Sequence, residues 1–386
     1  MSIVRTGRTA VARAVIAVAA AAGLLAVPAA TGHATPWPGG PDGPGRAVPW
    51  PDGFGPAPWS AEPAPSEPRA SAPSGVKTVS SGWNIPWGVN WLPDGTALIN
   101  ERDSLKLYRV TRSGARSEVK AEPHIAAFGS GASLLGIAVS PNWSRDHHIF
   151  VYHGAKNDCR IARLTFDGSR ISDYTPLVTG IKRGLHNGGR IKFGPDGYLY
   201  ATTGDADEPR IAQDKKSLNG KILRMTKAGK PAPGNPFGTL VYSYGHRNPE
   251  GLTWDDRGRL WETEIGEATH DELNLVKPGR NYGWPTCEGP CSTAGMTAPA
   301  HHWHPSRGVP SGLVYTDGAL YVAALRGQRL WRIPVHATGI GTPVAYYADT
   351  YGRLRDVVKV PGERALWVTT DKAGKNADKV LEVKLR

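Results

Sequence analysis

The sequence predicts an all-β protein folded as a six-bladed β-propeller over residues 76–386. One unit recurs six times after Val76: an apolar strand, a tight turn and a second apolar or aromatic strand. The turns lie about 45 to 60 residues apart, the interval expected of four-stranded propeller blades. No long amphipathic helix pattern interrupts the series. Six blades in about 310 residues leave roughly fifty residues for each blade, as that architecture requires.

The six units read as β-hairpins, because Asp-Gly or another Gly turn flanked by alternating apolar residues is a strong hairpin signal. They are WLPDGTALIN (Trp91–Asn100), VSPNWSRDHHIFVYH (Val139–His153), FGPDGYLYATTG (Phe193–Gly204), WDDRGRLWETE (Trp254–Glu264), YTDGALYVAAL (Tyr315–Leu325) and VPGERALWVTT (Val360–Thr370). We expect the strand Lys379–Val383 and the segment near Val76–Val79 to close the ring, which removes exposed sheet edges. A pair of β-sandwiches is the structural alternative.

Residues 1–34 have the layout of a secretory signal peptide. Three arginines precede an apolar run from Ala14 to Val27, and small residues surround position 34. The run is too short for a confident membrane span. We therefore expect a secreted protein, exported through a Sec-type signal peptide, with no stable membrane span.

Residues 35–75 are expected to form a disordered, semi-rigid linker. They contain 12 of the chain's 33 prolines, and Trp37, Trp50 and Trp59 each follow a proline. The segment lacks the apolar periodicity that a core needs. The alternative is an arm that binds a wall polymer or a protein partner.

Three cysteines fit an exported protein with one short disulfide, Cys287–Cys291, and one unpaired thiol at Cys159; two further free thiols are the alternative. A zinc site is not favoured, because the histidines after Cys291 match no familiar zinc spacing. The net charge of +12 comes from 46 Lys and Arg against 34 Asp and Glu, and the basic residues are scattered. This balance names no partner, and we expect none among nucleic acids.

The stretch from Ser243 to Pro285 is the densest mixture of cations, carboxylates and glycines in the chain. It contains the pairs Arg247–Asn248, Gly266–Glu267 and Asp271–Glu272. A guanidinium binds carboxylates, whereas Asp, Glu and the carbonyls of Gly-rich turns are the hard oxygen ligands that calcium prefers. The stretch could hold an anionic ligand and a cation together; the alternative is a solvated strand–turn–strand unit with surface charges.

Functional groups of a propeller lie at the mouth of its central channel, on the loops between blades. His186 stands in a Gly-rich loop before the third hairpin, and an imidazole is the usual general base for an alcohol proton. Asp205 follows the end of that hairpin and could orient this imidazole; an ordinary surface histidine is the alternative. Arg326, Arg353 and Arg355 also lie at the ends of hairpins or in the loops between them.

Guanidinium groups that converge from different blades repel one another unless a multiply charged anion binds between them. Together with Arg247, these arginines therefore predict an anionic ligand at the mouth. For each of them taken alone, surface solubility is the alternative.

Several ordered motifs resemble the soluble pyrroloquinoline quinone (PQQ)-dependent glucose and aldose sugar dehydrogenases. They are NIPWGVNWLPDG from about Trp83, the run His186–Asp205, SLNGKILRM (Ser217–Met225), GHRNPEGL to NYGWP, LRGQRLWR and RLRD. The resemblance covers nearly the whole chain after residue 83. It implies a six-bladed propeller that carries PQQ and Ca²⁺ and oxidises the anomeric carbon of an aldose to the lactone, passing electrons to an unknown acceptor.

The resemblance also implies roles for individual residues. His186 matches the base that takes the anomeric hydroxyl proton, and Asp205 matches the carboxylate that assists it. The residues that match cofactor contacts are Arg247, Asn248, Arg326, Arg353 and Arg355. The carbonyls of Gly266 and Glu267 match ligands of a calcium ion beside PQQ, and Glu272 with the Tyr282 carbonyl matches a second, structural calcium site.

Three departures from the family pattern stand out. Gly131 occupies a position that is usually polar, Leu185 replaces an acidic residue ahead of the histidine, and the segment around Trp303 is about one residue longer. Two other functions therefore stay open: a non-catalytic extracellular propeller that binds carbohydrate or protein, and a calcium-dependent lactonase or esterase.

Overall fold

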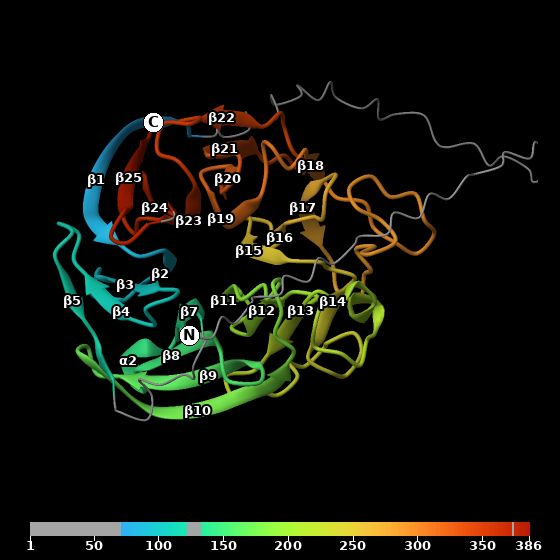
Figure 1. The fold of residues 1–386 in the computed structure, drawn as a ribbon, viewed down its shortest axis with the longest axis horizontal. Coiled ribbons are helices and arrows are strands. Elements are labelled where there is room, and N and C mark those ends of the chain that lie inside the picture. The colour runs from blue at the N-terminus through green and yellow to red at the C-terminus, as the bar shows by residue number, and fades with distance from the viewer. Residues whose placement is uncertain (1–70, 122–132, 373) are drawn as a thin grey trace, which may run out of the picture. The chain divides into compact units, whose positions relative to one another are not determined.

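The structure is a computed structural model that describes residues 71–121, 133–372 and 374–386. Six sheets follow one another around a ring (Figure 1), as predicted. The expected signal peptide, most of the expected linker and Gly131 lie outside the described residues. Strand β1 begins at Pro73, within the last three residues of the segment expected to be linker. Among the described residues, no helix is long and apolar enough to cross a membrane.

Each sheet is one blade, and its strands run in chain order from the innermost strand outward, except for β1 where the ring closes and for β6 at the outer edge of blade 2. Blades 1 to 3 are β2 (Pro86–Trp91), β3 (Ala97–Glu101), β4 (Leu107–Val110), β5 (Arg116–Glu118); β7 (Leu134–Val139), β8 (His148–Gly154), β9 (Cys159–Phe166), β10 (Arg170–Ile181), with β6 (Lys120–Ala121) added parallel to β10; and β11 (Ile191–Phe193), β12 (Leu199–Thr203), β13 (Lys221–Met225), β14 (Val241–Tyr244). Blades 4 to 6 are β15 (Pro249–Trp254), β16 (Leu260–Glu264), β17 (Asp271–Val276), β18 (His301–Trp303); β19 (Pro310–Thr316), β20 (Ala319–Ala324), β21 (Arg329–Pro334), β22 (Val344–Tyr346); and β23 (Leu354–Lys359), β24 (Ala365–Thr370), β25 (Asp378–Leu385), β1 (Pro73–Trp83).

The two ends of the described chain close the ring. Strand β1 pairs antiparallel with β25, in a register that sets Val76 opposite Val383 and Ser81 opposite Lys379. These are the segments that the sequence predicted for closure. The only other regular elements among the described residues are the short helices α2 (Trp143–Asp146) and η1 (Pro209–Gln213).

The six predicted hairpins connect the first and second strands of the six blades. Five of their turns contain a glycine with positive φ, at Gly95, Gly197, Gly258, Gly318 and Gly362. A residue with a Cβ rarely adopts this conformation. The second hairpin has no such glycine and turns through α2 and the left-handed residue His147 instead.

Six apolar clusters fill the six interfaces between neighbouring blades. The cluster between blades 3 and 4 is small, and it contains Tyr200, Ile222, Leu252, Leu260, Val276 and Tyr282. Buried polar side chains occupy the rest of that interface, including His246, Glu262, Glu264 and Asn274. The interface between blades 3 and 4 therefore contains a group of buried polar side chains.

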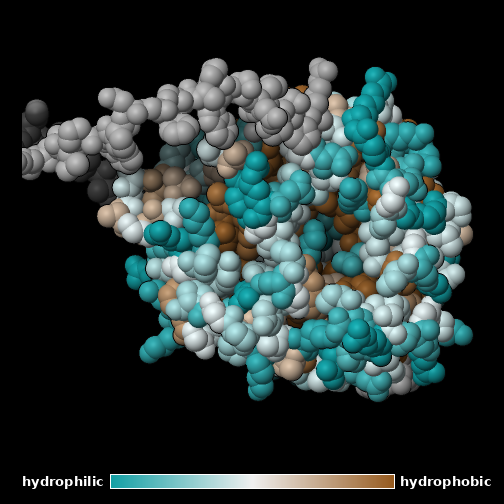
Figure 2. Space-filling model, turned by 180° about the vertical axis from the view of Figure 1, so that it is seen from behind, coloured by the Kyte–Doolittle hydropathy of each residue, from teal (hydrophilic) through white to brown (hydrophobic). Residues whose placement is uncertain are grey.

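The inner strands approach one another closely because four of them contain a glycine, Gly88 in β2, Gly136 in β7, Gly251 in β15 and Gly312 in β19. A Cβ at Gly136 would collide with the Gly189 carbonyl oxygen, and one at Gly251 would collide with the Ser311 carbonyl oxygen. Hydrophilic residues cover most of the face shown in Figure 2, and hydrophobic residues appear mainly where that surface is recessed.

Candidate functional site

His186 and Asp205 form a hydrogen-bonded pair between the blades, as the sequence predicted from their places beside one hairpin. His186 lies in the loop between β10 and β11, and Asp205 lies two residues after β12. The Nδ1 atom of His186 lies 2.8 Å from Oδ1 of Asp205, and Asp205 is 1% exposed. A carboxylate can only accept here, so Nδ1 donates its proton and Nε2 carries the lone pair. The imidazole is 19% exposed, and Nε2 has no hydrogen-bond partner among the described residues.

Glycines allow the His186 loop to lie against the strand end that carries Asp205. A Cβ at Gly204 would collide with the His186 carbonyl, and one at Gly184 would collide with Ala206. The Ala206 N–H donates to the His186 carbonyl oxygen at 3.0 Å. The Gly-rich composition around His186 therefore has a packing cause: it brings the base and the carboxylate into contact.

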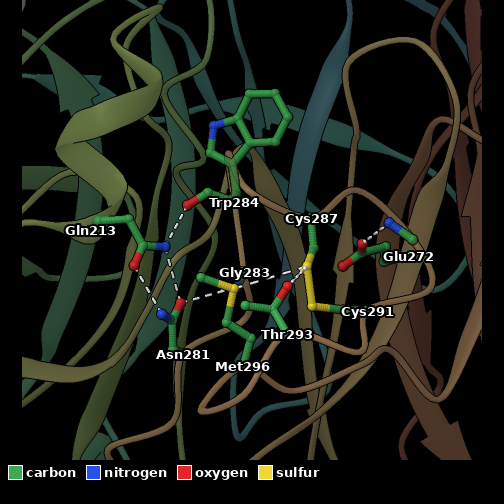
Figure 3. Close-up of a disulfide and its surroundings, with 10 residues drawn as sticks. Gln213, Glu272, Asn281, Gly283, Trp284, Cys287, Cys291, Thr293 and Met296 are labelled. Atoms are coloured by element: carbon green, nitrogen blue, oxygen red, sulfur yellow. Dashed lines mark hydrogen bonds between the residues drawn. A yellow bond between two sulfur atoms is a disulfide. The ribbon is translucent and has the colours of Figure 1, made fainter. Parts of the chain in front are cut away.

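Trp284 completes this arrangement, and the sequence analysis did not assign it a role. Its indole Nε1–H donates to Oδ2 of Asp205 at 2.8 Å. Figure 3 shows how its own backbone is held: the Gln213 amide donates to the Trp284 carbonyl at 2.6 Å and to Oδ1 of Asn281 at 3.0 Å. The motif NYGWP, which contains Trp284, is the sequence feature from which this role could have been predicted.

The predicted disulfide Cys287–Cys291 lies immediately after Trp284 (Figure 3). It closes a short loop whose Gly289 N–H donates to Glu272 at 2.6 Å. Cys159 is a free, buried thiol, as expected, and burial raises its pKa to about 11. Such a thiol is a packing residue, since the reactive form is the thiolate.

Arg247 and Asn248 lie in the same site. The Arg247 carbonyl accepts the Asp205 N–H at 2.8 Å, and the Arg247 guanidinium lies 5.4 Å from the Trp284 ring. Asn248 Oδ1 accepts the Gly188 N–H at 3.0 Å. Both residues are thus joined directly to the loop and the strand end that carry the His186–Asp205 pair.

The remaining predicted arginines are placed differently from one another. Arg355 is buried and binds Asp371 and Glu250, with 2.8 Å between Nη1 and the Glu250 carboxylate. The Arg353 side chain is half-exposed, with Nε 3.9 Å from Asp371. Arg326 is exposed in the turn after β20 and has no ion pair within the described part of the chain.

Several of the converging guanidinium groups have carboxylate partners within the protein. The expectation that these groups repel one another unless an anion binds between them was therefore wrong for those arginines. Arg247 Nε lies 3.1 Å from Glu267, and Arg355 lies between Glu250 and Asp371. Mutual repulsion is therefore relieved within the fold, and Arg326 and Arg353 are the predicted cations that stay most available to a ligand.

Arg102, which the sequence analysis did not single out, adds another cation from blade 1. It is partly exposed and forms a two-point ion pair with Asp103. This hydrogen bond raises the pKa of Arg102, and the charges of Asp371 and Glu250 act in the same direction. The influence of those two carboxylates places Arg102 near the Arg355 cluster.

The loop Gly266–His270 presents the predicted carbonyl ligands. The N–H groups of Glu267, Ala268 and Thr269 each donate to Oε1 of Glu288 at 2.8 Å, and the His270 N–H joins them at 3.1 Å. Burial opposes ionisation of Glu288, yet these hydrogen bonds lower its pKa below the ordinary value. The carbonyl oxygens of Gly266 and Glu267 accept no hydrogen bond from the described residues, so they are available to a cation.

Glu272 belongs to a buried acidic cluster that is larger than the sequence indicated. Asn274 donates to both Glu272 and Glu262 at 3.1 Å, and potential ligand atoms of His246, Glu262 and Glu264 lie within 4.8 Å of one another. Burial raises the pKa of Glu272 to about 8, and the nearby Glu264 charge adds to this. Burial also raises the pKa of Glu262 well above its ordinary value.

This cluster fits a hard cation. Oε1 of Glu262 and Oδ1 of Asn274 are buried and have no hydrogen-bond partner in the described part of the chain. Buried carboxylates are normally paired or bound to metal, and an oxygen-rich set is what calcium prefers. Tyr282 lies beside the cluster, with its ring stacked on His246 at 4.8 Å.

Two of the departures from the family pattern have clear positions. Leu185 is 83% exposed directly beside His186, so an apolar side chain faces solvent at the candidate site. Trp303 is buried in the cluster between blades 4 and 5. It is a core residue and is not available to stack on a ligand.

The chain is similar to several known proteins. The model of the family described as glucose/sorbosone dehydrogenase matches residues 83–380. The PQQ-bound aldose sugar dehydrogenase of Streptomyces coelicolor has 42% sequence identity and a TM-score of 0.75, covering 82% of this chain and 100% of that one. The aldose sugar dehydrogenase of Escherichia coli is 27% identical over 343 residues, which is 79% of this chain and 92% of the relative. The quinoprotein glucose dehydrogenase B of Acinetobacter calcoaceticus is 31% identical over 251 residues, which is 55% of this chain and 52% of the relative.

Proposed function

The chain belongs to the glucose/sorbosone dehydrogenase family, and from this premise we propose that it is an aldose sugar dehydrogenase that oxidises the anomeric carbon to the lactone. The observation that supports this best is the chain of hydrogen bonds from Trp284 through Asp205 to His186. It leaves one imidazole nitrogen, at a partly exposed position, without a hydrogen-bond partner in the part of the chain that the structure describes. A base so arranged can accept a proton from a sugar hydroxyl.

His186 acts as the general base in this proposal. Its Nε2 takes the proton of the anomeric hydroxyl, and Asp205 stabilises the imidazolium that forms, because its carboxylate already accepts the Nδ1 proton. The hydrogen on the anomeric carbon leaves as hydride, so the sugar loses two electrons and becomes the lactone. Trp284 acts as a positioning residue, since it contacts Asp205 and keeps that carboxylate in place.

PQQ is the cofactor that the relatives indicate, and when bound it supplies the two-electron acceptor for the hydride. It carries carboxylates, and the donor set of this chain fits such a group: Arg326 is exposed, Arg353 and Arg102 are partly exposed, and Arg247 and Asn248 lie beside His186. We assign these residues to binding the cofactor. The electron acceptor that follows PQQ stays unassigned.

Calcium is proposed at two places. The free carbonyls of Gly266 and Glu267 would hold one ion near the cofactor, where a Lewis acid stabilises developing negative charge. Glu272 and the Tyr282 carbonyl would hold the second, together with the neighbouring Glu262 and Asn274, whose unpaired oxygens support this assignment.

We also propose that the protein is exported through its N-terminal segment. The layout of residues 1–34 supports this. The Cys287–Cys291 disulfide supports it as well, because such bonds persist mainly in oxidising compartments.

The proposal is tested with the protein treated with Ca²⁺ and PQQ and supplied with aldoses and an artificial dye. We expect dye reduction by wild type and a loss of at least about a hundredfold in kcat for His186→Ala, the range for removing a general base. PQQ binding, measured by calorimetry, should persist in this variant. Dye reduction that survives His186→Ala would remove the assigned base. Absence of PQQ binding to wild type would favour a non-catalytic binding propeller, and lactone hydrolysis without PQQ would favour a lactonase.

Calcium is tested separately by chelation. Removal of the ion leaves several carboxylates buried together, so we expect a chelator to lower the Tm and added Ca²⁺ to restore it. Glu262→Gln should reduce this response, whereas Glu363→Gln, an exposed change in the turn between β23 and β24 of blade 6, should not. An identical Tm with and without the chelator would contradict the structural calcium site.

A further inference from the structure

The central channel contains a basic cavity that the proposed reaction does not use. It has a volume of about 250 Å³, and its lining includes Asn90, Arg190, Lys192, Asp356 and Lys359. The residues of the candidate site precede the inner strands, as His186 does for β11, Asn248 for β15 and Arg353 for β23. Arg190 lies one residue before β11, whereas Asn90, Lys192, Asp356 and Lys359 lie within the inner strands, and Lys359 ends β23. The lining contains none of His186, Asp205, Arg247 and Asn248, so the cavity is separate from the His186 site.

Arg190 forms the inner end of this cavity. Its guanidinium lies 4.2 Å from the Trp87 ring, Nη1 lies 3.1 Å from Asp356 and Nε donates to the Glu250 carbonyl at 2.9 Å. The residue is 8% exposed. Its second terminal nitrogen, Nη2, has no hydrogen-bond partner among the described residues. A buried cationic nitrogen without a partner is costly unless a ligand or water satisfies it.

Lys192 follows two residues later, so its side chain leaves the strand on the same side as that of Arg190. Its Nζ has only a long hydrogen bond, 3.4 Å, to the Leu252 carbonyl oxygen. Burial lowers the pKa of Lys192 to about 8, and the Arg190 charge lowers it further while Asp356 opposes the shift. Lys359, at the rim, is half-exposed and lies 3.8 Å from Asp317.

The charges that face the cavity do not balance. Asp356 is the one carboxylate among the lining residues, and it is already occupied by Arg190 and by the Val89 N–H at 3.0 Å. Asp317 pairs with Lys359 at the rim only. Lys192 has no carboxylate partner within hydrogen-bond distance in the described part of the chain. An uncompensated positive charge in a confined, poorly solvated space attracts an anion more strongly than one on the open surface.

From this geometry we propose that the cavity is a binding site for a small inorganic oxyanion such as phosphate, held by Lys192 and Lys359 against Arg190. The volume is below the roughly 300–1,000 Å³ of pockets for drug-sized ligands, so the cavity suits a small occupant. The site does not depend on the proposed sugar oxidation. Binding of the anion should raise the pKa of Lys192, because a neighbouring negative charge favours the ammonium form.

The test is isothermal titration calorimetry of the full chain with inorganic phosphate, at an ionic strength held constant with chloride. We expect saturable binding by wild type and at least about tenfold weaker binding by Lys192→Met, which keeps most of the side-chain volume. Lys359→Met should weaken binding several-fold. Lys384→Met is the matched control, since Lys384 is exposed on β25, and it should bind as wild type does.

A second measurement tests whether Lys192 takes up a proton when the anion binds. Near pH 8, titrations in two buffers with different ionisation heats should show net proton uptake with wild type, because anion binding protonates Lys192. The uptake should disappear in Lys192→Met. Equal affinity in all four proteins would place phosphate elsewhere on the basic surface and would overturn the proposal. The proposal would also be overturned if wild type showed no binding at a phosphate concentration of about 10 mM, ten times a Kd of 1 mM.

Discussion

Replacing Asp205 by Asn tests the arrangement around His186 most directly. Three donors converge on this carboxylate: His186 Nδ1 at 2.8 Å and the Asp207 N–H at 3.0 Å bind Oδ1, and Trp284 Nε1 at 2.8 Å binds Oδ2. An Asn amide offers one accepting oxygen and one donating NH₂ group, so the NH₂ group must face at least one of these three N–H donors. One hydrogen bond is lost in either orientation of the amide.

The effect depends on which bond is lost. If the NH₂ group faces His186, Nδ1 must become the acceptor and the proton moves to Nε2, which can then no longer act as a base. If it faces Trp284, the indole N–H is left buried without a partner, and a buried unpaired group costs about 1–3 kcal/mol. The imidazolium also loses its counter-charge in both cases. We therefore expect kcat to fall by about 10²–10⁴-fold, the range of general-base catalysis.

The assay is PQQ-dependent dye reduction at saturating aldose, with PQQ affinity measured separately. The matched control is Asp207→Asn, because Asp207 Oδ1 lies 3.3 Å from the same Nδ1 and its side chain is 44% exposed. It removes the same charge but leaves the bond between His186 and Asp205, and we expect a change within about threefold, as for an exposed ion pair. A kcat for Asp205→Asn within about threefold of wild type, or equal losses in both variants, would refute the proposed role of the hydrogen bond.

Three further predictions follow from the same contacts. Trp284→Phe removes the indole N–H that donates to Asp205, so it should lower kcat and lower the free energy of unfolding by about 1.5–3 kcal/mol, the value of a hydrogen bond to a charged group. Unchanged denaturant midpoints and an unchanged kcat would show that Asp205 is held in place without the indole. Arg355→Met leaves the Glu250 and Asp371 charges buried without their partner and should lower the free energy of unfolding, measured with denaturant, by about 3–5 kcal/mol. The exposed Arg326→Met should leave the free energy of unfolding almost unchanged and instead weaken PQQ binding in titrations. Similar losses of stability in both variants would contradict the difference in burial. The pKa of Lys192 is lowered from 10.5 to about 8, so between these pH values the unfolded chain binds more protons than the folded one. The free energy of unfolding of wild type, relative to that of Lys192→Met, should therefore rise as the pH increases from about 8 to 10.5. Parallel pH profiles of Tm for the two proteins in phosphate-free buffer would contradict the burial of the Lys192 charge.

Much of the fold follows from local signals. Hairpins such as Phe193–Gly204 combine alternating apolar residues with a Gly turn, and both signals depend only on neighbouring residues. Ring closure was also predictable, because the segment near Val76 precedes the first hairpin and the strand at Lys379–Val383 follows the last one, so the two lie at the ends of the repeated series. The short helix α2 and the fifth strand of blade 2 were not foreseen, since neither carries a periodic pattern of its own.

The site was predicted in part for the same reason. His186 and Asp205 flank one hairpin, so their contact follows from the local connection. Trp284 lies 79 residues after Asp205, and no local pattern joins them. The acidic cluster was missed because Glu262 and Asn274 read as ordinary strand residues, and only the pairing of β16 with β17 sets them face to face. Arg102 comes from blade 1, and its approach to the Arg355 cluster depends on closure of the whole ring.

The six hairpins, the short disulfide and the contact between a histidine and a nearby carboxylate could be predicted from the amino-acid order, because each depends on residues close together in the chain. Which charges meet, and which are neutralised, depends on the folded arrangement of the blades. The fold pairs Arg355 with Glu250 and Asp371. Among the described residues it leaves oxygens of Glu262 and Asn274 without hydrogen-bond partners, and it encloses Lys192 in the channel with no carboxylate at hydrogen-bond distance. Electrostatic energies depend on distance in space and on burial, and both are set by how the blades pack around the ring.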